Sequence, residues 1–255
     1  MYHILAEHND FLVVSKFAGV CVHCEPDRVG LLVHIKKDLG LEQLFPVHRL
    51  DKVTSGVLLC AKTSAAASEL SQLFQNRQVE KYYLALSDQK PKKKQGLISG
   101  DMERGRRGAW KLCHSKNKPA ITQFFSYGLG DGNRLFLLKP KTGKTHQLRV
   151  ALKSIGSPII GDRLYGHPLS LPEGILLHAS VLSFEYQGES YRYVDLPNDW
   201  LLDEKSLPDT FVNTLAKPPV NTLVKPPVNT LVKTLQDDAV MAIEKPWALS
   251  WPVIR

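Results

Sequence analysis

Short apolar segments bounded by turn-forming residues recur along most of this chain. They are rich in β-branched, aromatic and leucine side chains and too short for typical helices, so the pattern is typical of β-strands. It predicts strands over residues 11–16, 57–62, 82–86, 121–126, 135–139, 176–184 and 191–195.

Helical spacing, with apolar residues three and four positions apart, appears in three places. The predicted helices are one that follows Thr63 or Ser64 as N-cap, one from Leu148 to Ile155 that Gly156 ends, and a shorter one over residues 31–39. Strands outnumber helices, and long irregular connections separate them. The predicted fold class is therefore α+β, with a mostly antiparallel mixed sheet and flanking helices and loops, rather than a repeated βαβ unit.

The character of the chain changes near residue 203. An octapeptide, Val-Asn-Thr-Leu-x-Lys-Pro-Pro, begins at Val212 and recurs from Val220 and, in part, from Val228. Two prolines per repeat exclude a helix or a central strand, so we expect an extended or disordered spacer. The sequence thus predicts one folded domain over residues 1–202 and a low-complexity tail over residues 203–255. Whether the closing segment with Trp247 and Trp251 docks on a partner or folds back is left open.

The overall composition is that of a globular protein, with 43% hydrophobic and 23% charged residues. No apolar run approaches the roughly 20 residues that span a bilayer, so we expect no membrane association. The first residues lack the basic and apolar regions of a signal peptide, which predicts a cytoplasmic address.

The chain has four cysteines, Cys21, Cys24, Cys60 and Cys113, too few for a disulfide scaffold in 255 residues. Cys21 and Cys24 have the C-x-x-C spacing of zinc and redox sites. A zinc site needs a second pair of ligands, however, and none stands nearby at a suitable spacing. We expect reduced thiols and no metal; a small zinc or thiol protein is the alternative.

Basic residues are concentrated in one part of the chain. Residues 1–202 hold 27 basic against 19 acidic side chains, whereas the tail is balanced, and the net charge is +8. The densest stretches are 90–94 and 104–118, the second of which includes Arg104, Arg106, Arg107 and Lys111 with Trp110 between them. Such a patch suits a polyanion, because each phosphate it neutralises releases counterions. A solvated lysine-rich loop is the alternative that composition leaves open.

Two polar segments could carry chemistry. In residues 46–56, Asp51 stands among His48, Arg49 and Lys52, just before an apolar strand. A carboxylate beside an arginine is either an ion pair or a candidate catalytic group. In residues 141–149, cations lead into a helix whose N-terminus could hold an anion, or Thr145 could simply cap that helix.

These segments belong to a series of motifs that resembles the RluA-type pseudouridine synthases. The motifs are His48-Arg-Leu-Asp-Lys-Val-Thr-Ser-Gly56, Lys81-Tyr-Tyr83-Leu-Ala85, Thr142-Gly-Lys-Thr-His-Gln-Leu-Arg149, Gly161-Asp-Arg-Leu-Tyr-Gly166 and Leu177-His178-Ala179, in that order. The resemblance covers about residues 1–198, which makes residues 1–202 the catalytic domain. Two departures are Phe17 after Lys16, where the family usually has proline, and Lys144, where it often has arginine.

The resemblance implies the chemistry of an isomerase that detaches uracil from C1′ of its ribose, rotates the base and rejoins it through C5. No cofactor or metal is required. Asp51 would be the catalytic carboxylate, either as a nucleophile on C1′ or as a base at C2′. Arg149 would pair with Asp51 and keep it charged, and Tyr83 would lie against the base and help to remove the C5 proton.

The implied partner is RNA, ribosomal or transfer, and the target uridine must be flipped out of its helix. Arg49 would fill the vacated space. The other expected RNA contacts are Lys52, Lys144 and His146, with Arg104, Arg106, Arg107 and Lys111 holding flanking RNA. The motif histidines, His48, His146 and His178, are expected to hydrogen-bond and shape the pocket, and the protein to be a monomer. A catalytically silent RNA-binding protein that retains the fold is the alternative.

Overall fold

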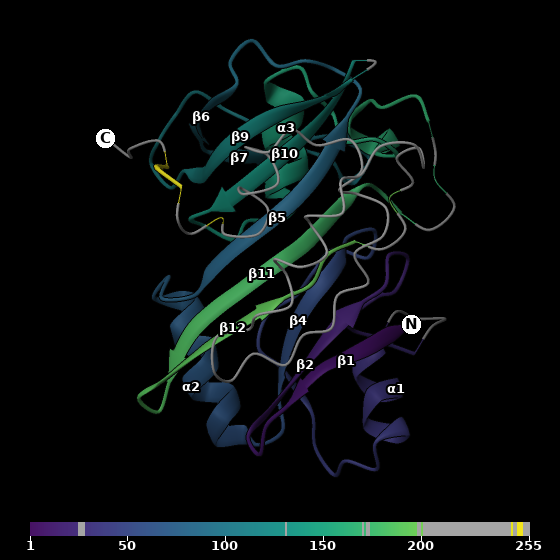
Figure 1. The fold of residues 1–255 in the computed structure, drawn as a ribbon, viewed down its shortest axis with the longest axis vertical. Helices are drawn as coiled ribbons and strands as arrows, with labels where there is room; N and C mark the ends of the chain where they lie inside the picture. The colour runs from purple at the N-terminus through teal and green to yellow at the C-terminus, as the bar shows by residue number, and fades with distance from the viewer. Residues whose placement is uncertain are drawn as a thin grey trace, which may run out of the picture. The chain divides into compact units, whose positions relative to one another are not determined.

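The computed structural model describes residues 1–24, 29–130, 132–169, 171, 174–197, 200, 246 and 249–251. They divide into two compact units, which are described separately. The first unit comprises Met1–Lys81 and His178–Pro197. The second comprises Tyr82–Leu177 and also contains Trp200 and Trp251. Figure 1 shows the elements of both.

The first unit contains a mixed sheet. Its strands are β1 (Tyr2–Glu7), β2 (Phe11–Lys16), β3 (Phe45–Pro46), β4 (Ser55–Ala61), β11 (Leu177–Tyr186) and β12 (Glu189–Val194). They are ordered β1-β2-β4-β11 (Figure 1). In addition, β3 pairs with β4 and β12 with β11. β4 and β11 run parallel, whereas the other pairs are antiparallel.

Two helices belong to this unit, α1 (Leu31–Asp38) and α2 (Ser64–Gln75). Thr63 is the N-cap of α2, because its side-chain oxygen accepts a hydrogen bond from the backbone N–H of Ala66 at 3.1 Å. Ala66 and Leu70 are buried in one core cluster with Val57 and Leu59 of β4. Val57 and Leu59 are two residues apart on β4 and therefore point to the same face of the sheet, the face on which α2 packs.

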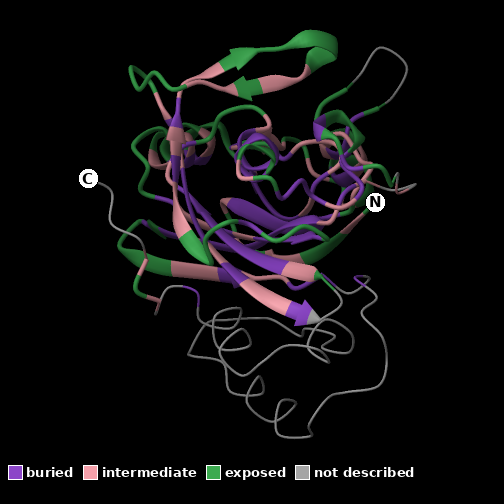
Figure 2. Ribbon diagram, turned by 90° about the horizontal axis from the view of Figure 1, so that it is seen from above, coloured by how far each residue is buried: buried purple, intermediate pink, exposed green. Residues whose placement is uncertain are grey.

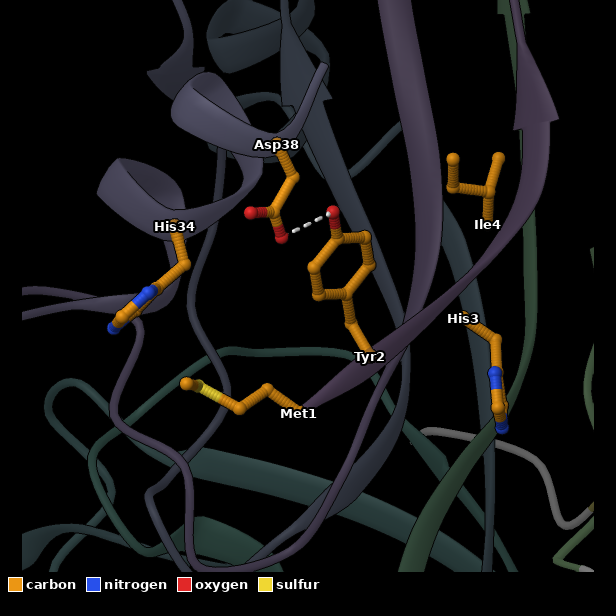
Figure 3. A pocket seen from close by; sticks show the side chains of 6 residues that line it. All are labelled: Met1, Tyr2, His3, Ile4, His34 and Asp38. Atoms are coloured by element: carbon orange, nitrogen blue, oxygen red, sulfur yellow. Dashed lines mark hydrogen bonds between the residues drawn. The ribbon is translucent and has the colours of Figure 1, made fainter.

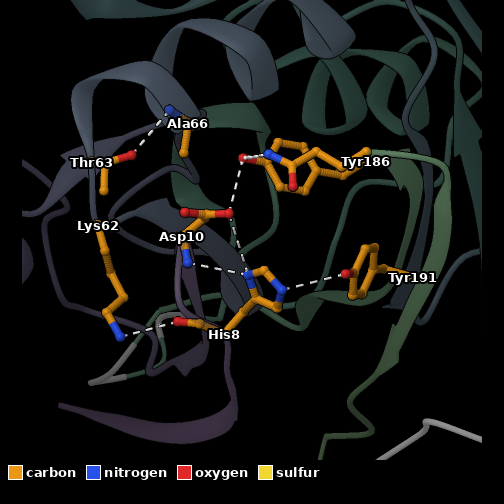
Figure 4. A network of polar contacts seen from close by, with 8 residues as sticks. His8, Asp10, Lys62, Thr63, Ala66, Tyr186 and Tyr191 are labelled. Carbon is orange, nitrogen blue, oxygen red and sulfur yellow. Dashed lines mark hydrogen bonds and ion pairs between the residues drawn. The ribbon is translucent and has the colours of Figure 1, made fainter.

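A polar cluster in the first unit contains His8, Asp10, Tyr186 and Tyr191 (Figure 4). His8 stacks on Phe11 with ring centroids 4.4 Å apart. The hydroxyl of Tyr186 donates to Asp10 at 3.3 Å, and that of Tyr191 lies 3.5 Å from Nε2 of His8. These contacts join the β1–β2 turn to the β11–β12 hairpin, so the polar cluster serves to hold the fold together.

The second unit is built on an antiparallel sheet. The strands of that sheet are β5 (Glu80–Ser87), β10 (Asn133–Pro140), β9 (Ala120–Gly130) and β6 (Gln95–Gly100), in this spatial order. β7 (Met102–Arg104) and β8 (Trp110–Leu112) form a separate hairpin around the short 3₁₀ helix Arg106–Gly108. Most of the residues of this hairpin are exposed, whereas the sheet is largely buried (Figure 2). The other helical elements are α3 (Gln147–Ser154) and a 3₁₀ turn, Arg163–Tyr165.

The structure confirms the α+β class, the seven predicted strands and the three predicted helices, with ends shifted by a few residues. The sequence did not predict β1, β3, β6 or the β7–β8 hairpin. The repeats lie outside the described residues, so the division into a domain over residues 1–202 and a tail stays a prediction. Among the described residues, no helix is both long enough and apolar enough to cross a membrane.

Candidate active site

Asp51 lies in a tight turn that leads into β4. The backbone N–H of Thr54 donates to the carbonyl oxygen of Asp51 at 3.0 Å, which closes the turn. Asp51 is half-buried, whereas Thr54 and the strand that follows are buried. The turn therefore joins a partly accessible carboxylate to a rigid strand.

Lys16, at the end of β2, holds one side of this turn. Its side chain is fully buried, and its Nζ donates to the carbonyl oxygens of Phe17, Val20 and Lys52 at 2.9, 2.8 and 3.2 Å. Burial lowers the pKa of Lys16 to about 8, because it disfavours the charged form, while the charges of Cys21 and Asp51 act in the opposite direction. One ammonium group thus ties the residue after Asp51 to the loop that follows β2.

A second contact holds the other end of the turn. Oγ of Ser55 lies 2.9 Å from Nδ1 of His178 in β11, and Nε2 of the same ring lies 3.1 Å from a carboxylate oxygen of Asp195. Gly56 follows with a φ of +108°, and a side chain there would meet the backbone of Ala179. Glycine is required at this position because β4 and β11 approach each other so closely.

His48 lies just before the turn and makes a structural contact. Its Nε2 accepts a hydrogen bond from the backbone N–H of Leu59 at 3.0 Å, and its ring stacks on Phe74. Burial lowers the pKa of His48 to about 3, and the positive charge of Lys81 acts in the same direction. A neutral ring is what an Nε2 acceptor requires.

Arg149, in α3 of the second unit, forms a buried ion pair with Asp162. Its Nε and Nη2 donate to the two carboxylate oxygens of Asp162 at 2.7 and 2.9 Å, and both residues are almost fully buried. The guanidinium also lies over the ring of Tyr165, 5.0 Å from its centroid. Such a bidentate pair fixes the orientation of the arginine fork.

The start of α3 is held by the side chain of Gln147. Its Oε1 accepts hydrogen bonds from Oγ1 of Thr142 and from the backbone N–H of Lys144, while its Nε2 donates to Ile121 and Thr122. The N-cap is His146, in a left-handed conformation and without a side-chain capping bond, so Thr145 does not cap this helix. Lys144 is exposed on the loop that these bonds position.

The basic hairpin β7–β8 is connected to the same unit through Tyr165. The backbone N–H of Trp110 donates to the Tyr165 hydroxyl at 2.9 Å, and that oxygen lies 2.8 Å from Nδ1 of His146. Arg104 stacks over the ring of Trp110. Arg104, Arg106, Arg107 and Lys111 are all exposed, and Lys111 pairs with Glu103 at 3.1 Å. Part of the predicted basic patch is thus an exposed β-hairpin.

The remaining candidates are distributed over both units. Tyr83 is half-buried on β5, where it pairs with Leu138 of β10. In the first unit, Arg49 is exposed and Lys52 is half-buried beside Asp51. The structure therefore groups Asp51, Arg49 and Lys52 in the first unit and Tyr83, Arg149, Lys144 and His146 in the second.

A surface pocket of about 510 Å³ lies apart from these residues (Figure 3). It is lined by Met1, Tyr2, His3, Ile4, His34 and Asp38, and the hydroxyl of Tyr2 donates to Asp38 at 3.1 Å. None of the candidate catalytic or RNA-binding residues lines it. Within the described part of the chain, no cluster of three or more histidine, cysteine, aspartate or glutamate side chains could hold a metal ion.

The sequence assigned no role to several residues that hold these arrangements, among them the buried Lys16, Asp162 and Tyr165. Asp162 and Tyr165 stand in the motif from Gly161 to Gly166, and the resemblance assigned a role to neither. The signal for Lys16 was its position at the end of the buried strand β2. A lysine there must either reach solvent or be enclosed by acceptors.

Comparisons with known proteins show the family of the chain. A family model described as RNA pseudouridylate synthase matches residues 10–154. The chain is 49% identical over 195 residues to an uncharacterized RNA pseudouridine synthase of Haemophilus influenzae, covering 76% of this chain and 87% of the relative. It is 35% identical over 191 residues to the dual-specificity RNA pseudouridine synthase RluA of Salmonella typhimurium, covering 72% and 86%.

A solved structure gives the same result. Human RNA pseudouridylate synthase domain containing 1 is similar with a TM-score of 0.66 and 28% identity, over 86% of this chain and 96% of that one. The chain therefore belongs to the RluA-type family of RNA pseudouridine synthases, isomerases that convert uridine in RNA to pseudouridine.

Proposed function

We propose that Asp51 is the catalytic carboxylate of this pseudouridine synthase and acts on the ribose of the target uridine. The observation that carries the proposal is the way in which the Asp51 turn is held. The backbone N–H of Thr54 closes the turn, and Lys16 donates to the carbonyl oxygen of Lys52. The side chain of Ser55 connects the turn to His178 of β11. A carboxylate that must meet C1′ or C2′ in one orientation gains rate from such pre-organisation.

Arg149 and Tyr83 are proposed to act on the same nucleotide. The bidentate bond to Asp162 orients the Arg149 guanidinium in advance, so little side-chain entropy is lost when it meets an anionic group. Its pairing with the Asp51 carboxylate stays a prediction from the family resemblance, as does the contact of Tyr83 with the uracil ring. The two roles open to Asp51, nucleophile at C1′ and base at C2′, are both compatible with a held carboxylate.

The RNA is proposed to be bound by cations of both units. The β7–β8 hairpin presents Arg104, Arg106, Arg107 and Lys111, and the loop before α3 presents Lys144 and His146. In the first unit, Lys52 adjoins Asp51, and Arg49 would occupy the space that the flipped base leaves. Contacts of this kind bind phosphates and position the substrate rather than read its sequence.

The substrate is proposed to be a uridine of ribosomal RNA, with transfer RNA as the alternative. We also propose that the protein acts as a monomer in the cytoplasm. The printed names of the relatives support RNA as the substrate class without specifying the RNA, apart from the dual specificity in the name of the Salmonella protein.

Mapping of pseudouridine in cellular RNA tests the substrate. Total RNA from cells with the gene deleted is labelled with carbodiimide and analysed by primer extension, with rescue by the wild type, by Asp51→Ala or by the matched control Asp38→Ala. Asp38 is an exposed carboxylate at the end of α1. The proposal predicts one or a few sites that return with the wild type and with Asp38→Ala only. Rescue by Asp51→Ala would contradict the role of Asp51.

A further inference from the structure

The indole of Trp251, close to the C-terminus, packs against the second unit. Its ring lies 5.0 Å from that of Phe125 in an edge-on arrangement and 5.7 Å from that of Tyr82. The ammonium of Lys139 lies 5.7 Å from the indole centroid, and Nε1 of Trp251 donates to the carbonyl oxygen of Pro246 at 2.7 Å. Ring contacts, a nearby cation and a hydrogen-bonded indole N–H are the features of a specific binding site for a tryptophan side chain.

The three contact residues lie on one face of the sheet. The strand register pairs Leu137 of β10 with both Leu84 of β5 and Phe125 of β9, and directly paired residues share a face. Tyr82 precedes Leu84 by two residues and Lys139 follows Leu137 by two, so both side chains lie on the same face. There Lys139 donates to the Tyr82 hydroxyl at 2.9 Å. Trp251 therefore lies across β5, β10 and β9 on that face.

The opposite face of the sheet is the one that meets α3. Thr122, which pairs with Pro140 on that opposite face, accepts a hydrogen bond from Gln147 of α3. Both faces carry buried apolar side chains. On the Trp251 face these are Leu84, Leu86, Leu135 and Leu137, each at most 3% exposed. A sheet that is apolar on two faces needs a cover on each.

We propose that the Trp251 face of the second unit is the docking surface of the chain's own C-terminal segment, with Trp251 as its anchor. Trp200, which is also buried, belongs to the same unit. Trp200 and Trp251, which stand before and after the octapeptide repeats, thus both belong to the second unit. The described residues of this segment, 246 and 249–251, thus belong to the second unit of the catalytic protein, and this inference does not depend on the role of Asp51.

Hydrogen exchange of the full-length protein tests the proposal, because exchange rates report local opening. Trp251→Ala should increase amide exchange in β5, β9 and β10 by about 10-fold or more, leave β2 and β4 unchanged, and increase binding of an apolar dye. Trp251→Phe, which keeps a ring over Lys139, should restore most of the protection. Leu169→Ala, at an exposed leucine of the same unit, is the control.

Two results would overturn the proposal. Unchanged exchange in β5, β9 and β10 on Trp251→Ala would show that the indole does not cover the sheet. Protection in the wild type that disappears on dilution would show that the occupant is the tail of a second copy. Protection that is independent of protein concentration supports docking within one chain.

Discussion

The Nζ atom of Lys16 lies 3.2 Å from the carbonyl oxygen of Lys52, the residue directly after the proposed catalytic carboxylate. The same atom bonds to the carbonyl oxygens of Phe17 and Val20, so one buried ammonium joins the end of β2 to the Asp51 turn. A buried charge is tolerated here because it meets three acceptors. The contact links the packing of the first unit to the orientation of its proposed catalytic group.

Lys16→Met keeps the approximate length of the side chain but removes the donor. It leaves three carbonyl oxygens without this bond, so the free energy of unfolding should fall by about 3 kcal/mol. The loosened turn should lower kcat by roughly 10-fold with little change in KM. Urea unfolding and steady-state kinetics measure the two effects. Lys36→Met, at an exposed lysine of α1, should change neither; a Lys16→Met enzyme with wild-type kcat would contradict the positioning role.

His48 should make the protein sensitive to acid. The pKa of its ring is about 3 in the folded state, against 6.5 in the unfolded chain. Between these values the unfolded state binds the proton and the folded state does not, so stability is lost as the pH falls from about 6.5 toward 3. The contribution is at most roughly 5 kcal/mol. The stabilisation that comes from keeping the His48 ring neutral is fully present above pH 6.5.

His48→Gln tests this dependence, because the glutamine oxygen can accept the Leu59 N–H bond without titrating. The difference in unfolding free energy between wild type and His48→Gln should therefore change steadily from pH 7 to pH 4. His114→Gln, at an exposed histidine, serves as the control. A pH-independent difference would show that His48 does not titrate in this way.

The Arg149–Asp162 pair should be sensitive to removal of one partner. Asp162→Asn leaves a buried guanidinium without its counter-charge and should cost about 3–5 kcal/mol. Replacing both partners, by Arg149→Met with Asp162→Leu, should destabilise less than the sum of the single changes. Urea unfolding of the wild type, the two single variants and the double variant as a double-mutant cycle measures the coupling. Additive single effects would indicate that the pair does not act as a unit.

The β7–β8 hairpin should contribute to RNA affinity and not to folding. Replacing Arg104, Arg106 and Arg107 by alanine should reduce the slope of log affinity against log salt by about 0.7 for each phosphate that these side chains neutralise. The melting temperature should stay within about 2 °C, because these side chains are exposed. Filter binding over a salt series gives the slope. An equal effect from Lys36→Ala with Lys37→Ala on α1 would show that the hairpin has no special role.

Periodicity and turn residues predicted the elements that form the cores of the two units. β2 and β4 are continuous buried runs, and Thr63 caps α2 as expected. β1 was not predicted because it is a half-exposed edge strand with mixed polar and apolar residues. The β7–β8 hairpin was not predicted because its short strands are charged and exposed, and Trp110 is tied to Tyr165, which is 55 residues away.

The motifs placed the candidate residues, but local patterns did not reveal their partners. Asp162 stands 13 residues from Arg149, beyond any helical spacing, and only the fold brings the two together. Lys16 and Lys52 are 36 residues apart, and a lysine after an apolar strand usually reaches solvent. Long-range polar pairs of this kind depend on strand order and register, which neighbouring residues in the sequence do not encode.

Tritium release from RNA labelled at C5 of uridine tests the central claim most directly, since forming pseudouridine removes the C5 hydrogen. Purified wild type, Asp51→Asn and the control Asp38→Asn are compared on the same RNA, with RNA binding measured in parallel. The account predicts that Asp51→Asn binds RNA within about 3-fold of wild type but releases tritium at least about 100-fold more slowly, while Asp38→Asn matches wild type. Release by Asp51→Asn at a rate close to wild type would contradict the account.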